Sequence, residues 1–159
     1  MATYTRRTRV AAPLSEVWKF HSKVSGLEAL TPEWMGLDVV SVRGPNGEPD
    51  PEILDVGAEI RMSLHPLGVG PKQEWTSHIV ARESDGHTAM FRDEMRGGPF
   101  QKWVHTHRFY GDGEETLVED HVEYELPGGE LGRALSPLGF VGFEPMFRQR
   151  HAKTRALLE

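Results

Sequence analysis

Two histidines separated by one residue, His105 and His107, are the side chains of this chain best suited to chemistry. If residues 100–110 form a strand, both imidazoles lie on one face, because successive side chains of a strand point to opposite sides. Trp103 and Phe109 fall on that same face, which indicates that the face is buried. A neutral imidazole can accept or donate a proton near physiological pH. The pattern predicts an inward-facing histidine pair.

Acidic and phenolic groups accompany this pair on neighbouring predicted strands. Asp93 falls on the apolar face of the segment 87–96. Asp120 and Tyr124 share a face of the segment 116–126. A buried carboxylate is costly unless it is paired, and histidine is its natural partner. We therefore expect an Asp/His/Tyr cluster on an otherwise apolar inner surface.

This cluster supports three interpretations. It can be a satisfied hydrogen-bond network that only braces the sheet. It can be the polar part of an apolar cavity, where it would orient a small molecule. His105 and His107 with one carboxylate are also a three-ligand set that a metal ion could use, although alternating histidines occur freely in strands.

The periodicity of the remaining sequence predicts the elements that position the cluster. Residues 3–10 alternate as a strand, Pro13 suits the start of a short helix, and a second short helix ends before Pro32. Six further strands are predicted at 36–43, 57–65, 72–83, 87–96, 100–110 and 116–126. Short turns rich in Gly, Pro, Asn and Asp separate most of them, which indicates an antiparallel meander, because parallel neighbours need long crossovers.

The C-terminal segment returns to a helical period. Pro145 suits the first turn of a long helix, and Met146 and His151 fall on its apolar face. The aromatic group of Phe140, Phe143 and Phe147 would cover the cavity, either as core or as ligand contacts. The predicted architecture is α+β, a curved seven-stranded antiparallel sheet with two short helices and a long C-terminal helix over its concave face. We expect residues 1–159 to form a single domain.

Composition excludes several classes of function. The 159 residues carry 18 Lys and Arg against 24 Asp and Glu, and the net charge of −6 argues against nucleic acid as a partner. The chain has no cysteine, which excludes disulfides, thiolate nucleophiles and cysteine-bound metal clusters. No apolar run approaches the roughly 20 residues of a membrane helix, and the first residues lack the apolar core of a secretory signal. We therefore expect a soluble cytoplasmic protein that does not insert into membranes.

Local sequence resembles that of a known superfamily. The segment 10–18, Val-Ala-Ala-Pro-Leu-Ser-Glu-Val-Trp, is similar to the opening of SRPBCC proteins (START / Bet v 1-like, polyketide cyclase/dehydrase-like). The segments 91–100, 103–109 and 120–127 resemble the ligand-binding subgroup of that superfamily. The resemblance covers essentially the whole chain. It implies a helix-grip fold that needs neither a metal nor a cofactor.

The resemblance also implies an internal cavity between the sheet and the terminal helix. We expect this cavity to bind a hydrophobic or aromatic small molecule, without an established reaction. The residues expected to contact the ligand come from the inner strand faces and the terminal helix: Trp75, Phe91, Asp93, Trp103, His105, His107, Asp120, Tyr124, Phe143 and Phe147.

Two alternatives remain open at this stage. The first is an enzyme of the polyketide cyclase, aromatase or dehydratase type, with a buried imidazole as general base and Tyr124 or the second histidine as proton donor. The second is a protein-interaction or homodimerising module that uses the outer sheet face or the loop 45–56. The sequence assigns no substrate.

Overall fold

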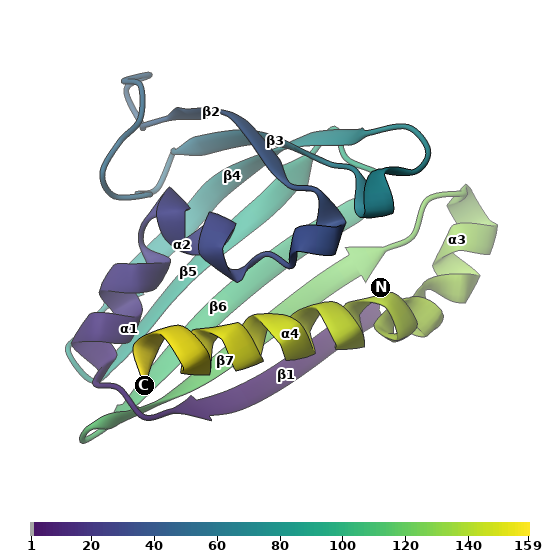
Figure 1. Ribbon diagram of the computed structural model, residues 1–159. Coiled ribbons are helices and arrows are strands. Elements are labelled where there is room, and N and C mark those ends of the chain that lie inside the picture. The colour runs from purple at the N-terminus through teal and green to yellow at the C-terminus, as the bar shows by residue number, and fades with distance from the viewer. Residues whose placement is uncertain (1) are drawn as a thin grey trace.

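The computed structural model describes residues 2–159, except for the side chains of Arg133, Ser136, Pro137 and Phe140. Within this range one antiparallel sheet of seven strands runs in the order β1-β7-β6-β5-β4-β3-β2 (Figure 1). Its strands are β1 (Ala2–Val10), β2 (Asp38–Arg43), β3 (Glu59–Leu64), β4 (Gln73–Ser84), β5 (Thr88–Arg96), β6 (Lys102–Asp112) and β7 (Glu115–Glu125). The predicted sheet is confirmed, and its strand ends differ from the expected ones by at most two residues.

The helices lie on one face of this sheet (Figure 1). They are α1 (Leu14–His21), α2 (Val24–Leu30), η1 (Glu33–Met35), η2 (Pro66–Gly68), α3 (Gly129–Leu135), η3 (Ser136–Gly139) and α4 (Phe140–Leu158). The long helix α4 crosses the sheet above β7 and β1, and α1 and α2 cover the neighbouring part of the same face (Figure 1). No helix within residues 2–159 combines the length and apolar character that crossing a membrane requires.

The expected start of the terminal helix at Pro145 is wrong. The helix begins at Phe140, so Pro145 lies inside it. A proline there leaves the carbonyl of Val141 without its helical donor. Val141 is largely exposed at 66%, so water can satisfy that carbonyl and the helix continues through the proline.

Three adjacent strands, β5, β6 and β7, position the polar cluster. The register sets Asp93 of β5 beside His105 of β6, and it sets His107 beside Asp120 of β7. Side chains that are direct cross-strand neighbours lie about 5 Å apart at Cβ and can interact. Strand pairing therefore gathers both acids and both imidazoles on one patch of the inner face.

Two apolar clusters lie on either side of this patch. One fills the space between α1 and the sheet and includes Phe91 and Phe109. The other lies between α4 and the sheet and is built around Phe147. The imidazole of His107 stacks on Phe91, and that of His105 meets Phe147 edge-on. Apolar side chains thus flank the polar groups on both sides.

Candidate functional site

A cavity of about 400 Å³ lies between the inner face of the sheet, α4 and the segment from α2 to η1. Apolar side chains form most of its wall, among them Leu27, Leu30, Trp34, Met35, Ile60, Met62, Trp75, Ile79, Phe91, Met95, Phe100, Trp103, Phe143, Met146 and Phe147. Pockets for small organic molecules usually measure about 300–1,000 Å³ and have a mainly apolar lining. The space and its wall therefore suit one compact hydrophobic ligand.

Most of the side chains predicted to contact a ligand line this cavity. They are Trp75, Phe91, Asp93, Trp103, His105, His107, Phe143 and Phe147. The side chain of Phe140 lies outside the part of the structure that is described.

Asp120 and Tyr124 do not line the cavity, in contrast to the expectation that all the inward polar groups look into one hollow. Both belong to β7, which α4 covers (Figure 1), so they are sealed beneath the helix with 2% and 1% exposure. Tyr124 packs against the edge of Phe143, with ring centroids 4.8 Å apart. Alternation along a strand assigns the face of a residue, but it does not show which part of that face a helix covers.

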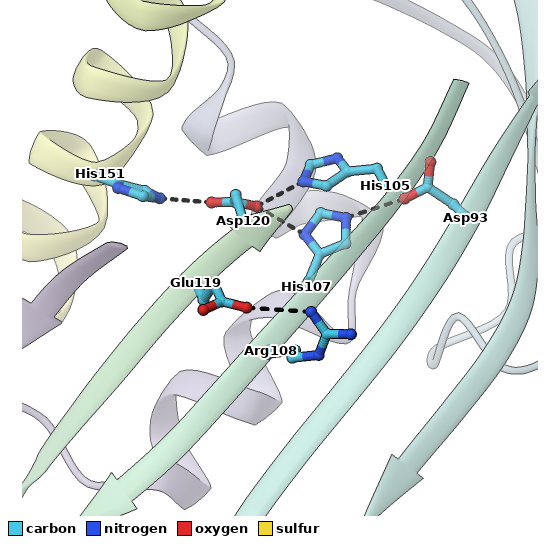
Figure 2. Close-up of polar contacts among 7 residues, drawn as sticks. All are labelled: Asp93, His105, His107, Arg108, Glu119, Asp120 and His151. Atoms are coloured by element: carbon cyan, nitrogen blue, oxygen red, sulfur yellow. Dashed lines mark hydrogen bonds and ion pairs between the residues drawn. The ribbon is translucent and has the colours of Figure 1, made fainter. Parts of the chain in front are cut away.

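The polar cluster forms one connected chain of contacts (Figure 2). Oδ1 of Asp120 lies 2.7 Å from Nε2 of His105 and 3.3 Å from Nδ1 of His107. Its other oxygen, Oδ2, lies 2.5 Å from Nε2 of His151, which reaches down from α4. Oδ2 of Asp93 lies 3.0 Å from Nε2 of His107. Two carboxylates thus hold three imidazoles in place.

The imidazoles of this cluster are also fixed by stacking. The rings of His105 and His107 lie 3.6 Å apart at their centroids with an angle of 28° between their planes. His107 stacks in turn on Phe91, at 3.9 Å and 13°. A stacked ring cannot tilt without losing contact with its neighbours, so the hydrogen-bonding directions of both imidazoles are set in advance.

Burial and hydrogen bonding shift the pKa values of the two stacked histidines in opposite directions. Burial lowers the pKa of His105 to about 4, and the neighbouring His107 contributes to that lowering. Burial also acts against charging His107, but hydrogen bonds to Asp120 and Asp93 outweigh it and raise its pKa above the usual value. Burial alone would raise the pKa of Asp120, whereas its three imidazole partners hold it well below the usual range. The cluster therefore favours a proton on His107, between two carboxylates, and a neutral His105.

The tautomer of His105 follows from these contacts. A carboxylate only accepts hydrogen bonds, so Nε2 of neutral His105 carries the hydrogen and donates it to Asp120. The lone pair then lies on Nδ1, which makes no hydrogen bond with any described residue. The corresponding Nδ1 atoms of His107 and His151 are fully buried, and both His105 and His107 are among the residues that line the cavity. Nδ1 of His105 is thus a nitrogen of a cavity-lining residue whose lone pair no described residue uses.

The same residues bear on metal binding. Asp93, His105 and His107 offer ligand atoms within 4.8 Å of one another, and they are the group in the described part of the chain that could hold an ion. Each Nε2 of the two histidines already meets a carboxylate oxygen. The two rings also stack on each other, which holds their orientation. An ion bound at either Nε2 would have to replace the hydrogen bond that this atom already makes.

Two histidines belong to the site without having been predicted there. His151 lies on the expected apolar face of α4, 1% exposed, where it contacts the second oxygen of Asp120. His21 of α1 lines the cavity, and its Nδ1 donates to the carbonyl of Val17. The sequence did contain a signal for both, since each is a titratable residue on the apolar face of an amphipathic helix. Which side chain or carbonyl group each histidine contacts depends on how its helix packs on the sheet.

Comparison with known proteins agrees with this architecture. A family model described as polyketide cyclase / dehydrase and lipid transport matches residues 10–152. No curated protein matches the sequence of the chain.

Several solved structures share the fold at low sequence identity. Protein TTHA0849 from Thermus thermophilus is 20% identical with a TM-score of 0.65, over 99% of this chain and 100% of that chain. Protein CV1439 from Chromobacterium violaceum is 18% identical with a TM-score of 0.69, over 100% and 99% of the two chains. Norcoclaurine synthase from Thalictrum flavum, solved in complex with dopamine and hydroxybenzaldehyde, is 18% identical with a TM-score of 0.64, over 99% and 86%.

The family match and the fold lead to the same assignment. The matched residues 10–152 include six strands of the sheet from β2 to β7, the helices α1 to α3 and most of α4. The solved structures match nearly all of the chain with the same arrangement of sheet and helix. The resemblance noted in the segment 10–18 and in the central strands is thereby confirmed. This chain belongs to the polyketide cyclase/dehydrase and lipid transport family of the SRPBCC (Bet v 1-like) superfamily.

Proposed function

We propose that this protein binds a hydrophobic or aromatic small molecule in the cavity beneath α4. The observation that carries the proposal is a space of about 400 Å³ with a mainly apolar wall and a few polar groups that converge on it. The aromatic wall would supply most of the contact area. Nδ1 of His105 would accept one hydrogen bond from the ligand and so fix its orientation.

The comparisons support this proposal at the level of the fold. Members of the family have a ligand cavity, and the family description includes lipid transport. The Thalictrum flavum enzyme holds two aromatic compounds, dopamine and hydroxybenzaldehyde, in its complex. A fold that accommodates such molecules is compatible with an aromatic ligand here, where rings from β4, β5, β6 and α4 line the space.

The electrostatics of the cluster favour binding over acid–base catalysis. A general base works best when its pKa lies near the working pH, whereas the pKa of His105 is about 4. His107 is the imidazole whose pKa is raised, but each of its nitrogens faces a carboxylate, Asp93 or Asp120. Its Nε2 bonds Asp93 and its Nδ1 is fully buried, so neither nitrogen is accessible to a ligand. The cluster provides a fixed acceptor more readily than a proton carrier.

Titration with the neutral fluorescent probe N-phenyl-1-naphthylamine tests the proposal. The probe should bind in a 1:1 ratio with enhanced emission. Ser77 lies on the inner face of β4 and lines the cavity, so Ser77→Phe places a ring in the space and should weaken binding roughly tenfold or more. Thr76→Phe adds the same ring on the outer face and serves as the matched control, with affinity unchanged.

Two results would contradict the proposal. One is a wild-type protein that binds neither this probe nor any co-purifying organic molecule detected by native mass spectrometry. The other is equal affinity in the Ser77→Phe and Thr76→Phe variants, which would place the bound probe outside the cavity. Circular dichroism on both variants confirms that the sheet is retained.

A further inference from the structure

One basic side chain in the cavity wall has no partner among the described residues. Arg150 of α4 is partly buried and lines the cavity. Its guanidinium makes no hydrogen bond, ion pair or ring contact with any of them. Each of the other partly buried arginines whose side chains are described contacts a carboxylate, a hydroxyl group or an aromatic ring. Arg150 is thus the exception among them.

An unpaired guanidinium in such a place is costly. It presents five N–H donors in a plane, and removing them partly from water without acceptors costs free energy. The positive charge is felt nearby, since burial lowers the pKa of His21 to about 3 and the charge of Arg150 adds to that effect. A ligand with acceptors at this point would relieve the cost.

The cavity wall carries a second positive charge besides that of Arg150. Lys23, at the start of α2, is a second basic residue in the lining, and it also has no partner among the described residues. Asp93 is the only acidic side chain among the described lining residues, and it is already paired with His107. The chain as a whole carries a net charge of −6, so a positive cavity end is opposite in sign to the rest of the molecule.

Position along α4 separates this basic end from the aromatic end of the cavity. Phe143 and Arg150 both line the space, and seven helical residues span about 10 Å. Phe143 lies beside Trp103, with ring centroids 5.4 Å apart. His105 meets Phe147, between these two positions on the helix. The cavity is therefore apolar and aromatic at one end and basic at the other.

We infer that the ligand of this cavity is an amphipathic carboxylic acid, with its hydrophobic body against Trp103 and Phe143 and its carboxylate at Arg150. A carboxylate matches the planar donor fork of arginine with two parallel hydrogen bonds. Lys23, two residues along the chain from His21, adds a second positive charge to the cavity wall. The inference rests on the proposed binding function and narrows it to one chemical class.

A matched pair of ligands tests this inference directly. The pair is 2-naphthylacetate and its neutral amide, 2-naphthylacetamide, each measured by displacement of N-phenyl-1-naphthylamine at low and at physiological salt. The wild-type protein should prefer the acid by about tenfold to a hundredfold, the size of a charge-assisted hydrogen-bond pair. This preference should fall as salt rises.

Variants of Arg150, Lys23 and Arg148 test which side chain causes the preference for the acid. Arg150→Gln should remove most of the preference for the acid, and Lys23→Gln should remove a smaller part of it. Arg148→Gln is the matched control, because Arg148 is an exposed residue of the same helix that pairs with Glu144 and does not line the cavity. That control should keep the wild-type preference.

The outcomes separate this inference from the proposal beneath it. Equal affinity of the wild-type protein for acid and amide would overturn the inference while leaving hydrophobic binding in place. An Arg150→Gln variant that loses acid and amide to the same extent would also overturn it, since the effect would then be structural. Failure of the wild-type protein to bind the fluorescent probe would instead defeat the proposed function itself.

Discussion

At the scale of single residues, Asp120 organises the site without facing the ligand space. Its two oxygens contact His105, His107 and His151, which come from β6 and α4. It is 2% exposed, so the carboxylate has little water to replace any partner that is lost. The same contacts set the tautomer of His105 and hold the proton on His107. One buried acid therefore determines the protonation of the two histidines in the cavity wall.

Replacing Asp120 tests how much it contributes to the stability of the fold. Asp120→Asn should lower the free energy of unfolding at pH 7 by about 3–5 kcal/mol, the usual cost of breaking a buried ion pair from one side. Urea unfolding followed by circular dichroism measures the change. Asp112→Asn, at an exposed carboxylate that pairs with Arg9, is the control and should stay within about 0.5 kcal/mol of the wild type.

The same pair of proteins yields a pH dependence with a definite sign. The pKa of Asp120 is depressed in the folded state, so its contribution is present above its unfolded pKa of about 3.9. That contribution is lost as the pH falls toward the folded pKa. The stability gap between wild type and Asp120→Asn should therefore be full at pH 7 and smaller at pH 3. A gap that is equal at both values would mean that the charge of Asp120 does not stabilise the fold.

At the scale of elements, strand register and helix docking have separate roles. Pairing of β5, β6 and β7 brings Asp93, His105, His107 and Asp120 to one patch. On the other face of the same strands, Arg108 and Glu119 pair at 3.2 Å, as alternation requires (Figure 2). The helix α4 then divides the inner face into a covered part, above β7, and an open part that becomes the cavity.

Two glycines in the helical segments make a test of local packing at this scale. A Cβ added to Gly142 of α4 meets nothing within 4 Å, so Gly142→Ala should stabilise the protein by roughly 0.5–1 kcal/mol through helix propensity. A Cβ on Gly132 of α3 would run into the carbonyl oxygens of Leu126 and Pro127, so Gly132→Ala should destabilise it. Thermal unfolding of both variants checks the opposite signs. A shift of the same sign in both would show that propensity alone, without packing, decides these positions.

At the scale of the whole molecule, the fold sets aside an unfilled volume in its interior. A cavity of about 400 Å³ forgoes contacts that a filled core would make. Two apolar clusters, one under α1 and one under α4, hold the sheet and helices around that space. The stability that the cavity costs can be recovered when a molecule fills it.

Ligand binding should therefore stabilise the protein by mass action. At a free concentration of N-phenyl-1-naphthylamine about 100 times its Kd, the free energy of unfolding should rise by about 2.7 kcal/mol. Thermal unfolding should show a corresponding increase in Tm of several degrees. The Thr76→Phe control should respond as the wild type does, and Ser77→Phe should show about half that rise or less, because a Kd at least tenfold weaker leaves the probe at only about 10 times the variant's Kd or below. A Tm that is independent of probe concentration in the wild type would contradict specific binding to the folded state.

The sequence by itself determined the order of elements and the faces of the strands. Period-2 alternation put His105 and His107 on one face with Trp103, and turn residues placed the strand ends close to where they lie. Both are local properties of the chain, since alternation is dictated by the geometry of one strand. The same local patterns predicted the seven-stranded sheet with a helix across it, and the family resemblance then named this arrangement as a helix-grip fold.

Only the tertiary structure decided which inward groups are accessible to a ligand. The docking of α4 over β7 buried Asp120 and Tyr124 and brought His151 onto the carboxylate. The same docking placed Arg150 in the wall of the cavity. Contacts between a helix and a strand far apart in the sequence depend on how the two surfaces pack together, and neither segment's own periodicity records that packing.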